Sequence, residues 1–161
     1  MHNRMIVTVG ISGSGKSTLC EQLVDEGYTR ICPDDIRKEL TGDISDQSQN
    51  GRVWNEAYAR LHAALYRGEN VVFDSIGTSR KTRNQLRAVA EEYGTPCIAY
   101  ALMDSLSKER CRDRVAADLE LGTERSNTLV DESILDRQHS MFLNTMHSID
   151  DEGFDTVLKV G

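Results

Sequence analysis

The chain has 161 residues, a length typical of one domain with its own hydrophobic core, and we expect a single domain over residues 1–161. Hydrophobic residues make up 39% and charged residues 28%, a balance that excludes an intrinsically disordered protein. No apolar run approaches the roughly 20 residues of a membrane-spanning helix. The formal net charge of −7 argues against a protein that coats long nucleic acids, but it allows a nucleic-acid end to enter a small basic pocket.

Four dispersed cysteines, with no C-x-x-C spacing, occur at Cys20, Cys32, Cys97 and Cys111. This dispersion predicts reduced, mostly buried thiols rather than metal ligands. The segment before the first apolar run is too short for a signal peptide. We therefore expect a cytoplasmic protein.

Apolar runs rich in β-branched residues alternate along the chain with segments of helical periodicity. The segments at 41–49 and 122–129 are polar and loop-like. Such alternation predicts an α/β fold, in which a parallel five-stranded sheet carries helices on both faces. We expect strands at about 5–9, 28–32, 71–74, 95–102 and 154–160, and helices at about 16–26, 33–40, 50–67, 78–93, 106–121 and 130–149.

Residues Gly10–Thr18 read Gly-Ile-Ser-Gly-Ser-Gly-Lys-Ser-Thr and fit the pattern G-x-x-x-x-G-K-[ST], between a predicted strand and a predicted helix. In this pattern the glycines let backbone N–H groups face phosphate oxygens, and the helix N-terminus adds its positive dipole end. Lys16 would reach the β- and γ-phosphates of a nucleoside triphosphate, and the Ser17 hydroxyl would bind Mg²⁺. The expected nucleotide-binding residues are Gly10, Ser12, Gly13, Ser14, Gly15, Lys16, Ser17 and Thr18.

Ligands of such sheets bind at the carboxyl ends of the strands. Four predicted features meet at that edge: the loop at 10–17, the pair Asp34 and Asp35, Asp74, and the segment after the fourth strand. The topology would therefore gather residues that are far apart in the sequence at one site.

The segment Asp34–Arg37 begins a predicted helix beside the phosphate-binding loop. A carboxylate there, Asp34, could accept the proton of a hydroxyl that attacks the γ-phosphate. Arg37 would share the helical face of Asp34 and hold a negative group of the acceptor, next to Asp35. The alternative is that Asp34 or Asp35 caps the helix and that Arg37 lies on the surface.

Asp74 ends a predicted apolar strand. A carboxylate in this position could contact Mg²⁺ through water. The alternative, which the sequence leaves open, is that Asp74 caps the helix that begins near Thr78.

A run rich in arginine, residues 108–114, follows the fourth strand. Arg110 and Arg114 are four residues apart and share one helical face, where they could stabilise the charge of a transferring phosphate. Arg112 in the same run and Arg125 in the polar stretch beyond it are further candidates for a closing lid. The alternative is a solvated helix with internal ion pairs.

A second basic cluster, formed by Arg80, Lys81, Arg83 and Arg87, begins the helix after Asp74. It could meet a polyanionic acceptor. A solvated outer face is the favoured interpretation, because most arginine and lysine side chains lie at the surface.

Together these motifs resemble the P-loop kinase group that includes the polynucleotide 5′-kinases, over nearly the whole chain. The resemblance implies the P-loop NTPase or kinase fold with a small helical lid at about 108–129. It also implies ATP as the phosphate donor and Mg²⁺ as the cofactor. The resemblance rests on Gly10–Thr18, on Asp34–Arg37, on the segment that ends at Asp74, and on Arg110 with Arg114.

By the same resemblance, Asp34 acts as the general base and Arg37 contacts a phosphate of the acceptor. Arg114, with Arg110 as its companion, contacts the donor phosphates, so Lys16, Asp34 and Arg114 are the expected catalytic residues. The segment at 116–128 is longer than the short lid of the family, which leaves Arg125 as an alternative lid arginine.

The predicted function is an ATP-dependent transfer of the γ-phosphate to a hydroxyl, first of all the 5′-hydroxyl of DNA or RNA, with a nucleic acid as the expected partner. One alternative keeps the chemistry but changes the acceptor to a hydroxymethyl pyrimidine base in phage DNA or to a small sugar or nucleoside. An alternative of another class is a nucleotide-binding ATPase or switch module. Asp34, Arg37 and the arginine-rich helix favour an enzyme.

Overall fold

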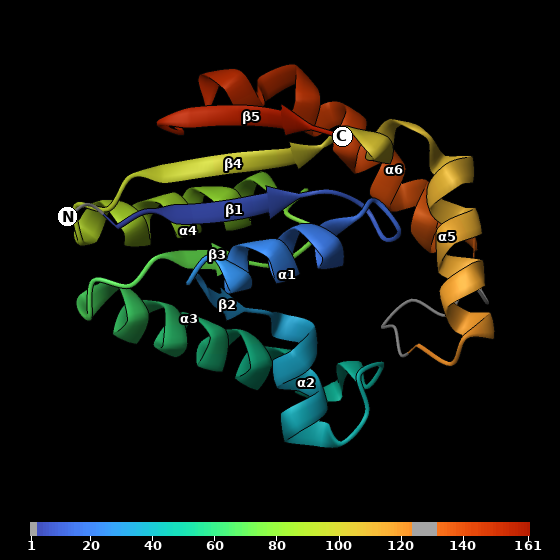
Figure 1. The fold of residues 1–161 in the computed structure, drawn as a ribbon, viewed down its shortest axis with the longest axis horizontal. Helices are drawn as coiled ribbons and strands as arrows, with labels where there is room; N and C mark the ends of the chain where they lie inside the picture. Colours follow the sequence, from blue (N-terminus) through green and yellow to red (C-terminus); the bar gives the residue numbers. More distant parts are fainter. Residues whose placement is uncertain (1–2, 124–131) are drawn as a thin grey trace.

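The computed structural model describes residues 3–123 and 132–161, which form a parallel five-stranded sheet with helices on both faces (Figure 1). This confirms the predicted α/β fold, with each described element within a few residues of its predicted limits. The strands lie in the order β2-β3-β1-β4-β5. They are β1 (Met5–Val9), β2 (Thr29–Ile31), β3 (Val71–Phe73), β4 (Cys97–Leu102) and β5 (Thr156–Val160).

Every neighbouring pair of strands is parallel, and helices connect the strands, as a parallel sheet requires. They are α1 (Lys16–Asp25), α2 (Pro33–Thr41), α3 (Asn50–Tyr66), α4 (Arg80–Glu92), α5 (Lys108–Glu120) and α6 (Glu132–Ser148). Short 3₁₀ helices that the sequence patterns do not predict lie at Gln47–Gln49, Met103–Leu106 and Ile149–Asp151.

The central strand β1 sends alternate side chains to the two faces of the sheet. Met5 and Val7 pack in one buried cluster with side chains of α2, α3 and α4. Ile6 points to the opposite face and packs with α1. Val9, at the carboxyl end of β1, packs in a cluster that includes side chains of α5 and α6. The segment after β1 therefore lies beside α5 and α6, two helices that are distant from it in the sequence.

All four cysteines are free thiols and are buried, as expected. Burial, more than any neighbouring charge, raises the pKa of Cys20, Cys32 and Cys97 to about 12 each. These thiols stay protonated at neutral pH and act as packing groups. Within residues 3–123 and 132–161, no helix is both long and apolar enough to cross a membrane.

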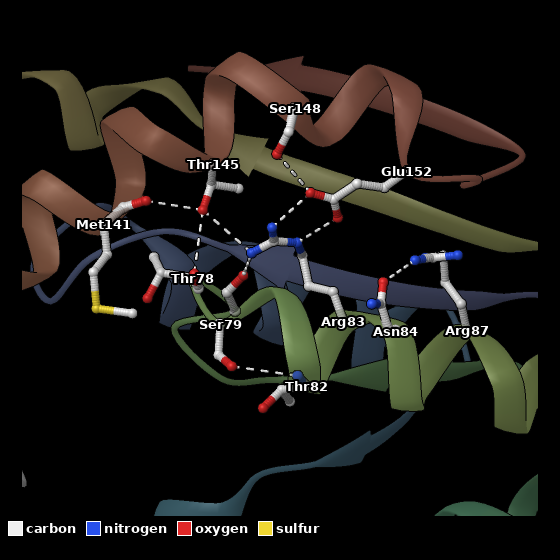
Figure 2. Close-up of polar contacts among 11 residues, drawn as sticks. Thr78, Ser79, Thr82, Arg83, Asn84, Arg87, Met141, Thr145, Ser148 and Glu152 are labelled. Carbon is white, nitrogen blue, oxygen red and sulfur yellow. Dashed lines mark hydrogen bonds and ion pairs between the residues drawn. The ribbon is translucent and has the colours of Figure 1, made fainter.

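Arg83 lies inside the protein, which contradicts the prediction of a solvated basic face at the start of α4 (Figure 2). Only 1% of the residue is exposed. Its Nε and Nη2 donate to the two carboxylate oxygens of Glu152 at 2.8 and 2.7 Å. Its Nη1 donates to the carbonyl oxygen of Gly77 at 2.9 Å and to the hydroxyl of Thr145 at 3.2 Å. Arginine can be buried here because a matched carboxylate and two further oxygens satisfy it.

The other members of that cluster lie closer to the prediction. Arg80 and Lys81 are exposed. Arg87 is half-buried, with its guanidinium 5.2 Å above the ring centroid of Phe154. The cluster is thus divided between two exposed side chains, one stacked arginine and one structural arginine.

Candidate active site

The phosphate-binding loop joins β1 to α1, and its shape depends on glycine. Gly13 and Gly15 have φ angles of 81° and 98°. A Cβ atom on Gly13 would lie 2.3 Å from the carbonyl oxygen of Cys111 in α5, so a side chain cannot fit there. Because α1 begins at Lys16, directly after Gly15, its first unpaired N–H groups lie at the loop.

Two hydrogen bonds fix the entry to the loop. The N–H of Gly10 donates to the carbonyl oxygen of Ile76 at 2.9 Å, and the N–H of Ile11 donates to the Ser105 hydroxyl at 3.1 Å. Ile76 follows β3 and Ser105 follows β4, so the strands on either side of β1 both hold the loop. Sequence reasoning did not identify Ser105.

The second half of the loop carries groups that fit a bound phosphate. Lys16 is half-buried, while Ser17 and Thr18 are exposed at the first turn of α1. The Ser14 hydroxyl is buried and has no hydrogen-bond partner within the part of the chain that the structure describes. A buried hydroxyl of this kind needs a partner, and a phosphate oxygen in the loop would supply one. The exposed Ser17 hydroxyl is the type of oxygen ligand that Mg²⁺ prefers.

A Gly13→Ala variant is expected to bind MgATP more weakly, by about five- to hundredfold, because a non-glycine residue in this backbone conformation costs about 1–3 kcal/mol. The overlap with Cys111 would also displace either the loop or α5. Calorimetric titration with MgATP measures the effect. Gly51→Ala is the matched control, since a Cβ there meets nothing within 4 Å. Equal affinities of the two variants would show that the loop tolerates the methyl group.

Arg37 is buried, with 5% of the residue exposed, and it holds Asp34. The Nη1 atom of Arg37 lies 2.5 Å from Oδ1 of Asp34, whose side chain is 45% exposed. The Nε atom of Arg37 donates to Oδ1 of Asn50 at 3.2 Å. The alternative of a surface arginine is therefore wrong: Arg37 fixes the Asp34 carboxylate at the start of α2, while that carboxylate stays accessible to solvent.

Capping does not explain the acidic pair either. The residue at the N-cap of α2 is Cys32, with no side-chain cap, and Pro33 occupies the first turn. Asp34 and Asp35 lie inside the first turn, where the positive end of the helix dipole stabilises their negative charges. Both carboxylates therefore form ion pairs at the sheet edge, Asp34 with Arg37 and Asp35 with Arg30.

Arg30, the middle residue of β2, connects the remaining two candidate carboxylates. Its Nη2 lies 2.5 Å from Oδ2 of Asp74, and its Nη1 lies 3.1 Å from Oδ2 of Asp35. Burial alone would lower the pKa of Arg30, but Asp74 raises it above its ordinary value. Sequence reasoning missed Arg30, because one arginine in a short strand carries no motif.

Asp74 is buried, with 6% of the residue exposed. It does not cap α4, because the Ser79 hydroxyl accepts from the N–H of Thr82 there, at 3.3 Å. After burial, the Asp74 charge is the largest factor that raises the pKa of Cys20 in α1, which places this carboxylate beside the helix that follows the loop. A contact of Asp74 with Mg²⁺ stays a prediction.

Helix α5 brings Arg114 onto the phosphate-binding loop. Its Nη1 donates to the carbonyl oxygen of Gly13 at 3.1 Å, and its Nη2 lies 2.8 Å from Oδ2 of Asp104. Arg110 pairs with the other oxygen of Asp104 at 3.3 Å. The hydrogen bond from Arg114 lowers the pKa of Asp104 below its ordinary value. Asp104, which sequence reasoning missed, therefore holds both predicted lid arginines, of which Arg114 contacts the loop.

The other lid candidates are placed differently. Arg112 lies 3.8 Å from a carboxylate oxygen of Glu132 in α6, so it joins the two helices. Arg125 lies outside the described residues. Of the described lid candidates, Arg114 contacts the phosphate-binding loop directly, and Arg110 shares its partner Asp104.

The loop also receives a side chain from α6 that the sequence did not single out. The N–H of Ser12 donates to Oε1 of Gln138 at 3.1 Å. Because α6 lies more than a hundred residues beyond the loop, only the fold reveals this contact.

The sheet order, the glycine-rich loop after β1 and the arginines of α5 define a domain with the P-loop kinase fold. The chain belongs to the AAA_33 family, whose model is described as an AAA domain and matches residues 5–144.

Three proteins illustrate the similarity. Adenylate kinase isoenzyme 1 of Gallus gallus is 34% identical over 76 residues, which are 47% of this chain and 34% of that enzyme, so the match spans about a third of its length. A chain of the Pnkp1/Rnl/Hen1 RNA repair complex superposes with a TM-score of 0.77 at 19% identity, over 91% of this chain and 46% of that one. Kti12 of Chaetomium thermophilum, in complex with ADP-AlF3, gives a TM-score of 0.64 at 20% identity, over 98% and 88%. The two structures share the fold of this chain.

Proposed function

We propose that the chain is an ATP-dependent phosphotransferase that moves the γ-phosphate to the 5′-hydroxyl of DNA or RNA. The observation that carries the proposal is the position of Asp34. An accessible carboxylate, fixed by Arg37, follows β2 at the same sheet edge as the phosphate-binding loop that follows β1. A nucleotide-binding switch needs the loop but has no need of this carboxylate.

The reaction assigns one task to each group. The loop amides and Lys16 hold the triphosphate. The acceptor oxygen forms a bond to the γ-phosphorus as the bond from that phosphorus to the β–γ bridging oxygen breaks, and ADP leaves. Asp34 takes the proton of the acceptor hydroxyl. Arg114 and Arg110 stabilise the charge on the transferring phosphoryl group.

Mg²⁺ would neutralise charge on the β- and γ-phosphates when bound. The oxygen ligands for it are the Ser17 hydroxyl and, through water, the Asp74 carboxylate. Arg30 holds one oxygen of Asp74 and thereby fixes the side chain at the sheet edge.

Two observations bear on the acceptor. The similar proteins include a chain of an RNA repair complex and an adenylate kinase, which supports a nucleic-acid or nucleotide substrate. Arg37 is the acceptor-side arginine closest to Asp34, but Asp34 and Asn50 already engage two of its nitrogens. Within residues 3–123 and 132–161, Nη2 is the nitrogen of Arg37 without a hydrogen-bond partner, and an acceptor phosphate would bind there.

A panel of acceptors with γ-labelled ATP and Mg²⁺ tests the proposal. The arms are 5′-hydroxyl DNA and RNA oligonucleotides, duplex DNA with hydroxymethyl pyrimidines, and small sugars and nucleosides. We expect label on the 5′ end of an oligonucleotide. Label only on modified bases or only on small acceptors would contradict the 5′-hydroxyl assignment and select one of the alternative acceptors.

A further inference from the structure

The hydrogen bond between Ser12 and Gln138 fixes the chemistry of the glutamine amide. A backbone N–H can only donate, so the atom that accepts it is the amide oxygen, Oε1. The bond joins α6 to the residue directly before Gly13, the glycine that lies against Cys111 of α5. The loop is thus held from α6 at the peptide between Ile11 and Ser12, and it lies against α5 at Gly13.

Gln138 lies on the core face of α6. Leu135, Phe142 and Thr145 are buried, and with Gln138 they follow the three- and four-residue spacing of one helical face. Gln138 itself is only half-buried. A polar residue on an otherwise buried stripe needs a partner, and the loop N–H provides it. This stripe is the signal in the sequence that could have identified Gln138.

The other end of α6 is anchored by the buried Arg83 (Figure 2). Two turns beyond Gln138, the Thr145 hydroxyl accepts from Nη1 of Arg83 and donates to the carbonyl oxygen of Thr78. The Glu152 carboxylate accepts hydrogen bonds from Nε and Nη2 of Arg83. It also accepts one from the Ser148 hydroxyl at 2.8 Å. The position of α6 along its axis is therefore set by directional bonds as well as by apolar packing.

The same network reaches the loop by a second route. Arg83 donates to the carbonyl oxygen of Gly77, where a Cβ would lie 2.2 Å from the carbonyl oxygen of Thr8 in β1. Gly77 follows Ile76, whose carbonyl oxygen accepts from the N–H of Gly10. The buried pair of Arg83 and Glu152 thus supports the loop at Gly10 through the segment after β3 and at Ser12 through α6.

We infer that Gln138 is a positioning residue for nucleotide binding: its amide oxygen holds the Ile11–Ser12 peptide through the N–H of Ser12, so that the following loop amides face the phosphates. The inference deepens the proposed function and, for its consequence in catalysis, rests on it. Gln138 acts through the loop, so its loss raises the nucleotide Kd and the KM for ATP more than it changes the KM for the acceptor.

Hydrogen exchange of the nucleotide-free protein, followed by mass spectrometry, tests the contact without any activity assay. Gln138→Met removes the acceptor oxygen at nearly constant length and should speed exchange in the peptide that contains residues 10–15 by about five- to tenfold, the equivalent of one hydrogen bond. Gln138→Glu keeps an acceptor oxygen and should restore slow exchange. Asn144→Leu, an amide removed from an exposed position of α6, is the matched control and should leave the loop unchanged.

Wild-type exchange of the loop in Gln138→Met, or equally fast exchange in Gln138→Met and Gln138→Glu, would overturn the inference. Faster exchange spread evenly over the sheet would do so as well, because it would indicate general destabilisation. A calorimetric titration with MgATP then tests the consequence, and a Kd equal to that of Asn144→Leu would contradict it. If the loop responds as expected but no acceptor is phosphorylated by the wild-type protein, the proposed function fails while the positioning role stands.

Discussion

Replacing Asp34 with asparagine is expected to lower the rate of phosphate transfer by about 10²- to 10⁴-fold, the usual contribution of a general base. Asparagine keeps the shape of the side chain and an oxygen that can accept from Nη1 of Arg37, which lies 2.5 Å from Asp34 in the native protein. It cannot take up the proton of the acceptor. The affinity for MgATP should not change, because the loop and Lys16 lie on other elements.

Transfer of label from ATP and calorimetric titration with MgATP measure the two effects in the same preparations. Asp25→Asn is the control, since Asp25 is an exposed carboxylate at the end of α1. A variant at Asp34 that transfers phosphate at the wild-type rate would remove the general base from the mechanism. A variant that also loses MgATP would show that Asp34 supports the structure of the loop.

Replacing Arg83 with methionine is expected to lower the free energy of unfolding by about 3–5 kcal/mol, the typical cost of leaving one partner of a buried ion pair alone. The side chains of Arg83 and Glu152 are 2% and 0% exposed, so the carboxylate that remains cannot reach water without a local rearrangement. Urea unfolding at pH 7 measures the change. The double variant Arg83→Met/Glu152→Leu should recover most of it, because both charges are then absent.

The same pair predicts how stability depends on pH. Burial alone would raise the pKa of Glu152, but hydrogen bonds from Arg83 and Ser148 outweigh it and lower the pKa below the ordinary value of 4.5. A lowered pKa means that the pair contributes its stability above the pKa of the unfolded chain and loses it as the pH falls through the folded pKa. Below pH 4.5 the wild type should lose stability more steeply than the double variant. The structural role of the Arg83–Glu152 pair would be contradicted if the stability of the wild type and of the double variant fell in parallel with pH. It would also be contradicted if Arg83→Met were as stable as Arg80→Met, which replaces an exposed arginine.

The donor side of the site could be predicted from the sequence because it lies in one contiguous stretch. Gly10–Thr18 carries the two fixed glycines and the lysine of the pattern at the required spacing, and the flanking apolar runs identify the strand and the helix around it. Asp34 and Asp74 could be placed at the same edge because each follows the end of a predicted strand of the parallel sheet. Periodicity and chain order suffice for such features.

The contacts that hold these groups could not be predicted in the same way. Arg30, Asp104 and Gln138 each act across the fold. Arg30 and Asp104 belong to no local pattern, and the helical stripe on which Gln138 lies does not reveal its partner in the loop. Arg83 was misjudged for a related reason: a basic residue among basic neighbours is typical of a surface, and its partner Glu152 lies 69 residues away. Only the packing of α4 against α6 shows that this arginine is internal.

The most direct test of the central claim, that a phosphate-binding loop and an acceptor-activating carboxylate work in one reaction, is the fate of the γ-phosphate. Wild-type protein is incubated with γ-labelled ATP and Mg²⁺, with and without a 5′-hydroxyl oligonucleotide, and label is counted on the oligonucleotide and in free phosphate. The account predicts that ATP is consumed mainly when the oligonucleotide is present and that the label is recovered on it. Label released as free phosphate at the same rate in both reactions, with none on any acceptor of the panel, would contradict it.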